Sequence, residues 1–283
     1  MTTTKTKTRT SPGSKGRTKP SAAKGKGRVK APVEPKDPVL EEIESHLRAF
    51  SYNRDSPATD RDGHVWRKVV FSGPRSVFKK LLQHSVAQEL HTLTVAGQNG
   101  TSSDFKNAIA DLAGGPPLES LRELRLGVVP EGQSAGSFGK LKCGDLSALA
   151  AACPRLEVLR LLCPGFVAGA HPTLRVLDAR LGALASSVAS LANADLPKLE
   201  ELHLGYEVDQ DEPLNEALLW KARALDPILT GESLPALRRL HLWPMPEDQE
   251  FAQKIKGSPL GKRVKVKVHD LDDIGEDTDA YEE

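Results

Sequence analysis

Apolar and polar residues alternate in a short motif that recurs along the chain. The motif is Leu-x-x-Leu-x-Leu, and its clearest copies begin at Leu121, Leu199 and Leu237. The same frame fits residues 156–161, and four further copies, with substitutions, begin at Trp66, Leu90, Leu174 and Arg263. The last four positions of each copy alternate, which is the periodicity of a half-buried β-strand. We therefore predict eight short strands between residues 66 and 268.

The segments between these strands change to helical periodicity. Residues 76–84, for example, place Val77, Phe78, Leu81 and Leu82 on one side of a helix. Comparable apolar faces occur within residues 101–115, 144–153, 182–194, 214–229 and 247–255. A helix after each strand implies that the strands are parallel.

A single strand with three apolar side chains cannot form a core alone, but stacked copies of it can. The pattern therefore predicts an α/β fold, a leucine-rich-repeat solenoid shaped like a horseshoe. Its parallel sheet would line the concave face and its helices the convex face. We place this domain at residues 39–269. Residues 40–50 have apolar side chains at helical spacing and predict a capping helix over the first repeat.

Several stretches resemble a known family. They are LRELRLGVVP, GDLSALAAACPRLEVLRLLCPG and HPTLRVLDARLGAL, together with prolines that precede the strands at Pro154, Pro172, Pro197 and Pro235. They are similar to the divergent bacterial cytoplasmic leucine-rich-repeat proteins that are found near WGR-domain proteins. The resemblance spans residues 46 to 260 and implies an interaction module to which no catalytic motif carries over.

The two ends of the chain carry opposite charge, although the totals of 39 basic and 38 acidic residues nearly balance. We predict disordered tails at residues 1–38 and 270–283, because both segments are polar with little to bury. The C-terminal tail is acidic. The basic tail either neutralises nucleic-acid phosphates or serves as a solubilising segment that pairs loosely with the acidic tail. Its basic residues are Lys5, Lys7, Arg9, Lys15, Arg17, Lys19, Lys24, Lys26, Arg28 and Lys30.

Other sequence features bear on location and assembly. No apolar stretch approaches the length that spans a bilayer, and the N-terminus lacks the apolar segment of a secretory signal. We therefore expect a cytoplasmic protein with no membrane contact, and a monomer. Cys143, Cys153 and Cys163 have no zinc-type spacing, so we expect reduced, partly buried thiols.

Side chains two, four and six residues after the start of each motif should face the concave side, in rows across the sheet. Arginine and tryptophan are frequent at interface hot spots, so we expect this face to bind a protein partner of unknown identity. The residues selected for this role are Arg125, Arg160, Leu162, Asp178, Arg180, His203, Arg239, His241 and Trp243.

Two chemical alternatives compete with simple binding. Asp178, His203 and His241 are metal-ligand types on successive strands, but such side chains also pair with each other or with water, and we favour that interpretation. The string from Gly132 to Gly136 matches a nucleophile elbow but lacks the strand and helix that an elbow needs. We therefore predict no enzyme activity, no catalytic residue, no metal and no cofactor. The expected function is a non-catalytic scaffold; the alternative is a nucleic-acid-associated protein tethered through its basic tail.

Overall fold

The computed structural model describes residues 37–47, 67–96, 105–127, 142–163, 165–179, 185–205, 225–243 and 249–269. Contacts between Cα atoms divide the chain into two units, residues 1–36 and 37–283. All described residues belong to the second unit. The ten basic residues selected in the N-terminal tail and the acidic residues 270–283 therefore lie outside the described residues.

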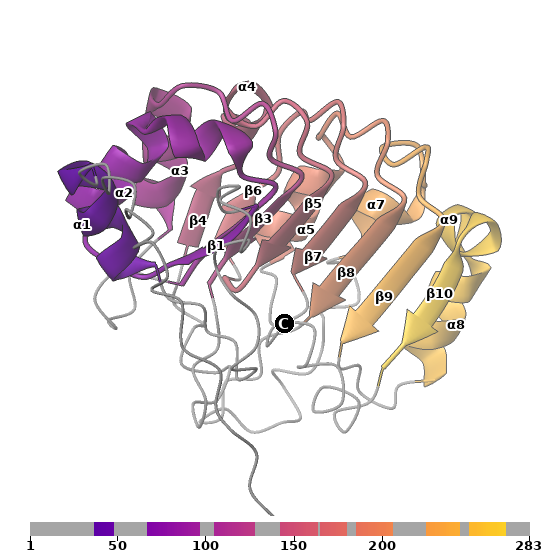
Figure 1. Ribbon diagram of the computed structural model, residues 1–283. Coiled ribbons are helices and arrows are strands. Elements are labelled where there is room, and N and C mark those ends of the chain that lie inside the picture. Colours follow the sequence, from indigo (N-terminus) through magenta and orange to yellow (C-terminus); the bar gives the residue numbers. More distant parts are fainter. Residues whose placement is uncertain are drawn as a thin grey trace, which may run out of the picture. The chain divides into compact units, whose positions relative to one another are not determined.

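Eight parallel strands form the main sheet of the second unit (Figure 1). In spatial order they are β1 (Lys68–Phe71), β2 (Thr92–Val95), β3 (Glu123–Leu126), β5 (Val158–Leu161), β7 (Val176–Ala179), β8 (Glu201–Gly205), β9 (Arg239–Trp243) and β10 (Lys265–Val268). Each strand falls on one predicted copy of the motif and pairs with the copies next to it, so β1 and β10 at the two ends each pair with one strand of this sheet. The predicted strands and their parallel direction are confirmed.

The pairing register stacks equivalent motif positions on one another. Leu93 of β2 pairs with Leu124 of β3, and Leu124 pairs with Leu159 of β5. The same row continues through Leu177, Leu202 and Leu240, and all six leucines are at most 2% exposed. A stack of this kind gives a continuous apolar core that no single repeat could provide.

Helical segments connect the strands and contribute their apolar faces to the same core. They are α1 (Pro38–His46), α2 (Arg75–Gln83), the 3₁₀ helix η1 (Ser85–Glu89), α3 (Lys106–Gly114), α4 (Leu149–Ala152), α5 (Ala185–Leu191), α7 (Asp226–Leu229), α8 (Gln249–Gly257) and α9 (Pro259–Arg263). The predicted face of α2, from Val77 to Leu82, is buried as expected. Much of the long helix predicted over residues 214–229 lies outside the described residues.

The predicted capping helix corresponds to α1. The Asp37 side chain accepts a hydrogen bond from the Val39 amide at its start, and Ile43 is fully buried. The helix ends at His46, and Leu47 then forms an antiparallel bridge with Phe71 of β1. Residues 38–47 therefore cover the apolar side of the first repeat and also pair with the edge strand.

A second, two-stranded parallel sheet was not predicted. It consists of β4 (Lys142–Asp145) and β6 (Gly165–Val167), which lie in the connections before and after β5. Both strands are short, and β4 contains Gly144 in a left-handed conformation with a φ of 78°. β4 contacts α3, and β6 contacts α5. The two connections are therefore joined to each other as well as to the main sheet.

Within the described part of the chain, no helix has the length and apolar character needed to cross a bilayer.

Candidate interaction surface on the main sheet

Two rows of side chains cross the face of the main sheet opposite the leucine core, and we call this face the polar face. The row at the second motif position contains Lys68, Thr92, Glu123, Val158, Val176, Glu201, Arg239 and Lys265. The row at the fourth position contains Val70, Thr94, Arg125, Arg160, Asp178, His203, His241 and Lys267. Both rows have the order that the motif predicts. Neighbouring side chains within a row are close enough to interact, because adjacent strands lie about 4.7–4.9 Å apart.

The centre of the polar face is a chain of charge pairs. Glu123 Oε1 accepts hydrogen bonds from the Nε atoms of Arg125 and Arg160, each at 2.9 Å. Arg160 also donates from Nη1 to Asp178 Oδ2 at 3.1 Å. Burial alone would raise the pKa of Glu123, but the charge of Arg125 and the hydrogen bonds from Arg160 and Arg125 outweigh it and hold that pKa below its usual range.

Arg160 has a structural role within this chain. Asp178 is fully buried, and Arg160 Nη1 lies 3.1 Å from its carboxylate. A buried carboxylate that loses its cationic partner retains the full cost of its desolvation. Arg160 therefore stabilises the sheet, whatever else its guanidinium contacts.

A second group of polar residues lies on β8, β9 and the end of β10. Glu201 Oε1 is 2.6 Å from His203 Nε2 and 3.9 Å from His241 Nε2, and Glu201 Oε2 pairs with Arg239. The rings of His203 and His241 are stacked, with centroids 4.3 Å apart and an interplanar angle of 18°. His241 Nδ1 is 3.0 Å from the Nε2 atom of His269.

The environment of His241 keeps its ring neutral. Burial, and then the charge of the neighbouring His203, lower the pKa of His241 to about 4, although Glu201 acts in the opposite direction. At neutral pH its imidazole therefore carries no charge and retains one nitrogen lone pair.

The structure separates the selected site residues into three sets. Arg125, Arg160 and Asp178 belong to the central charge pairs, and His203, Arg239 and His241 surround Glu201. Arg180 lies outside the described residues, and for Trp243 only its backbone is described, paired with Gly205. Leu162 forms the third set by itself.

The interaction role expected for Leu162 needs correction. Its side chain is 2% exposed, so it is not available to a partner. Leu162 is buried because it packs against the backbone of Gly127, the residue that follows β3. A Cβ atom added to Gly127 would lie 2.4 Å from the Leu162 Cβ. Gly127 also has a φ of 103°, which favours glycine. The absence of a side chain here therefore allows both this backbone conformation and the close packing of Leu162.

Three residues of the polar face were not selected from the sequence. Glu123 and Glu201 occupy the second motif position, and His269 occupies the sixth position of the last copy. Glu123 pairs with the two arginines, Glu201 pairs with His203 and Arg239, and His269 contacts the ring of His241. Alignment of the motif copies could have identified the two glutamates. It places each carboxylate on a strand next to arginines or histidines, where the side chains can pair.

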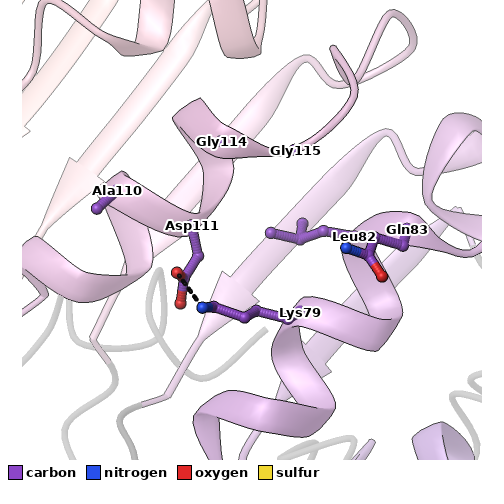
Figure 2. Close-up of a pocket in the computed structure, with 7 residues that line it drawn as sticks. All are labelled: Lys79, Leu82, Gln83, Ala110, Asp111, Gly114 and Gly115. Carbon is purple, nitrogen blue, oxygen red and sulfur yellow. Dashed lines mark ion pairs between the residues drawn. The ribbon is translucent and has the colours of Figure 1, made fainter.

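A pocket of about 280 Å³ lies between α2 and α3, away from the polar face. Its lining includes Leu82, Gly114 and the Asp111 carboxylate (Figure 2). Asp111 is already bound by Arg75, through Nε at 2.6 Å and Nη2 at 2.7 Å, and by Lys79 at 3.5 Å. The carboxylate therefore holds two helices together and offers little to a ligand.

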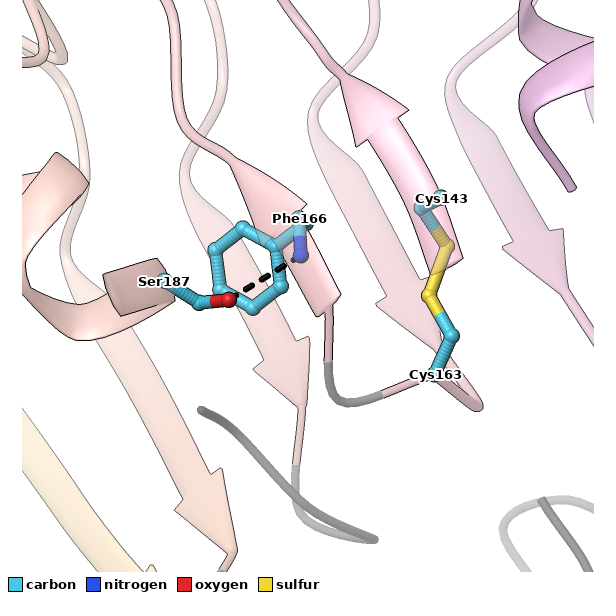
Figure 3. Close-up of a disulfide and its surroundings, with 4 residues drawn as sticks. All are labelled: Cys143, Cys163, Phe166 and Ser187. Carbon is cyan, nitrogen blue, oxygen red and sulfur yellow. Dashed lines mark hydrogen bonds between the residues drawn. A yellow bond between two sulfur atoms is a disulfide. The ribbon is translucent and has the colours of Figure 1, made fainter. Parts of the chain in front are cut away.

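The cysteines differ from the expectation of three reduced thiols. Cys143 of β4 and Cys163 form a disulfide, beside the hydrogen bond from the Phe166 amide to Ser187 Oγ at 3.0 Å (Figure 3). The two cysteines are 20 residues apart, but the β4–β6 pairing brings their Cα atoms to 6.3 Å. Cys153 is free and buried, and burial raises the pKa of its thiol to about 12, so it is protonated and unreactive.

No protein-family model matches the chain, and no curated protein matches it. A crystal structure of a protein from Bacteroides fragilis, a structural genomics target, is similar with a TM-score of 0.51 and 18% sequence identity. The match covers 66% of this chain and 53% of that one, or about half its length. At this level of identity the similarity concerns the fold alone.

Proposed function

We propose that the chain is a leucine-rich-repeat solenoid that acts as a non-catalytic scaffold and binds a protein partner on the polar face, the concave side of the horseshoe. Repeated motifs, parallel strands and in-register leucines support the solenoid. The resemblance to bacterial leucine-rich-repeat proteins supports an interaction role.

One observation carries the binding proposal, namely the exposure of fixed cationic groups at the β9–β10 end of the polar face. The Arg239 side chain is 56% exposed even while it pairs with Glu201, and Lys265 and Lys267 are exposed on the neighbouring strand. Residues on a rigid sheet lose little conformational freedom when a partner binds. A partner with an acidic surface fits this end of the face best.

The disulfide bears on where such a scaffold works. Disulfides persist in oxidising compartments and are rare in the cytosol. The Cys143–Cys163 bond therefore weighs against the cytoplasmic location that the resemblance implies.

The test compares charge reversal on two faces of the same region. The double variant Lys265→Glu/Lys267→Glu changes the polar face, and the matched control Lys256→Glu/Lys262→Glu changes exposed lysines on α8 and α9. Partners are recovered by affinity pull-down from a lysate of the source organism and quantified for each variant. We expect recovery to fall at least tenfold for the polar-face variant and to stay at the wild-type level for the control. Equal recovery from both variants, with equal melting temperatures, would reject the proposal.

A second candidate is a nucleic-acid-associated protein. Ten Lys or Arg residues and no acidic residue within residues 1–30 favour it. Deletion of residues 1–30 should abolish a mobility shift with DNA or RNA at low salt, and the full chain should release nucleic acid steeply as salt rises. A full chain that shows no shift at low salt would exclude this candidate.

A further inference from the structure

We propose that Glu201, His203 and His241 form a binding site for a divalent transition-metal ion, with zinc as the reference ion. Each residue offers one ligand atom, and these atoms all lie within 4.8 Å of one another. The site requires no partner protein, so it can be tested independently of the scaffold function.

The sheet itself brings these three residues together. His203 and His241 are register partners on β8 and β9, and Glu201 precedes His203 by one pleat on the same face. Glu201 Oε1 lies near the Nε2 atoms of both rings, 2.6 Å from that of His203 and 3.9 Å from that of His241. Ligand atoms in a tetrahedral zinc site are roughly 3.3 Å apart, given metal–ligand bonds of about 2.0–2.1 Å. The 2.6 Å separation must widen and the 3.9 Å separation must shorten, each by less than about 1 Å. The His203 ring must also turn out of its stack with His241, so that both Nε2 atoms face one ion.

His269 gives the site its second layer of contacts. A histidine that binds a metal through Nε2 carries its proton on Nδ1, and that proton is normally held by an acceptor. The Nδ1 atom of His241 is 3.0 Å from His269 Nε2, which can accept this hydrogen bond. The His269 ring is almost completely buried and packs against His241, with centroids 5.2 Å apart. It therefore fixes the orientation of His241 with Nε2 directed at Glu201.

The ligand types indicate the class of ion. Two imidazoles and one carboxylate suit zinc, nickel, cobalt or copper, whereas magnesium and calcium prefer sites built from oxygen ligands alone. Three protein ligands leave a fourth position for water or for a side chain of a bound molecule. Imidazole and carboxylate ligands bind a metal only in their deprotonated forms, so the ion competes with protons.

The structure also changes the third ligand suggested by the sequence. Asp178 is the register partner of His203, but its carboxylate is engaged by Arg160. Glu201 takes the role instead, because its two oxygens point to different neighbours. Oε2 pairs with Arg239, and Oε1 remains beside the two imidazoles.

Two cations next to the site oppose the ion. Arg239 pairs with Glu201, and Lys267 is the register partner of His241. Their charges lower the affinity for a divalent cation, and removal of the Arg239 charge should therefore strengthen binding. This gain in affinity distinguishes a metal site from a purely structural ion pair, for which the loss of Arg239 would not change metal affinity.

The experiment is calorimetric titration of the full chain, free of any affinity tag, with zinc chloride at neutral pH. We expect one zinc ion per chain. The variants His203→Gln, His241→Gln and Glu201→Gln should each weaken binding at least tenfold. His91→Gln is the matched control, because His91 is exposed and far along the sheet from β8 and β9. Substitution of cobalt for zinc provides a second readout, since its absorption spectrum reports the ligand geometry.

Each outcome decides the proposal. Loss of binding in the three variants, with the control unchanged, supports it. Folded variants that bind zinc as tightly as the wild type overturn it, and the acidic residues 270–283 would then be the remaining source of any binding. If the buried His203 variant fails to fold, Arg239→Gln decides, because its side chain is exposed. Zinc binding that tightens several-fold supports the site, and unchanged binding rejects it.

Discussion

Arg160 shows how one side chain connects several parts of the sheet. Its guanidinium contacts Glu123 on the row of the second motif position and Asp178 on the next strand. The sequence indicated Arg160 as a contact for a partner. The structure assigns it first to the neutralisation of a buried carboxylate.

Replacement of Arg160 by alanine should therefore destabilise the fold. The expected loss is about 3–5 kcal/mol of unfolding free energy, because the variant removes the Arg160 guanidinium from the buried Asp178 carboxylate. Arg175→Ala is the matched control. Arg175 forms a pair with Glu200 at 2.9 Å, but its side chain is 51% exposed, so its loss should cost far less than the loss of Arg160. Urea denaturation of both variants measures the difference, and equal losses would show that the central pairs are not structural.

His171 is a second residue whose surroundings make a prediction. It is buried, and burial lowers the pKa of its imidazole below the ordinary 6.5. Below that pH the unfolded chain takes up a proton at this position that the folded chain does not. Protonation of His171 in the unfolded chain therefore lowers the free energy of unfolding as pH falls below about 6.5. Above that pH, His171 adds nothing to the pH dependence of stability.

The variant His171→Gln should remove this part of the pH dependence. Urea midpoints measured in steps from neutral to acidic pH should fall less steeply for the variant than for the wild type. The slope that remains reports the other groups whose pKa is lowered in the folded chain, such as His241 and Glu123. Parallel profiles would mean that His171 is protonated alike in the folded and unfolded chains.

At the scale of elements, the length and periodicity of a segment decided whether it could be predicted. The eight strands of the main sheet follow from the motif because seven copies place three apolar side chains at a fixed offset and the last, from Arg263, places two. The helix α2 follows equally well, with four apolar residues on one face. β4 and β6 could not be predicted in this way. They do not carry the motif, they include glycine, and their pairing depends on contacts between distant segments.

The candidate site was predictable in position but not in its contacts. The motif placed His203 and His241 in one row because strand register follows from the aligned leucines. It did not show which carboxylate each histidine meets. That choice depends on side-chain rotation, which left Asp178 with Arg160 and directed Glu201 toward the rings.

The disulfide is a property of the β4–β6 element and gives a further prediction. A link that closes a loop of 20 residues should contribute about 3 kcal/mol by restricting the unfolded chain. The variant Cys143→Ser/Cys163→Ser should therefore lower the thermal midpoint, as should a reducing agent added to the wild type. The reducing agent should not change the thermal midpoint of the double variant, so this variant is the internal control. Thiol titration of the unfolded wild type without reductant should give one free thiol, from Cys153, whereas three would contradict the bond.

At the scale of the whole described unit, the main sheet is built by adding one repeat to the next. Each strand pairs only with its neighbours in sequence among the described strands of that sheet. Stability is then carried by successive interfaces, each with its own leucines. The two ends of the sheet differ. At the first, Leu47 pairs with β1; at the last, β10 has β9 on one side.

Lys265 and Lys267 acquire a further meaning from that last position. An edge strand offers unpaired backbone groups to which a strand from another molecule can add, and this is how aggregates begin to grow. The two lysines alternate along β10 and are both exposed, so a second copy approaching in register would bring like charges together. The same cations that we propose attract an acidic partner would thereby keep concentrated chains from joining end to end.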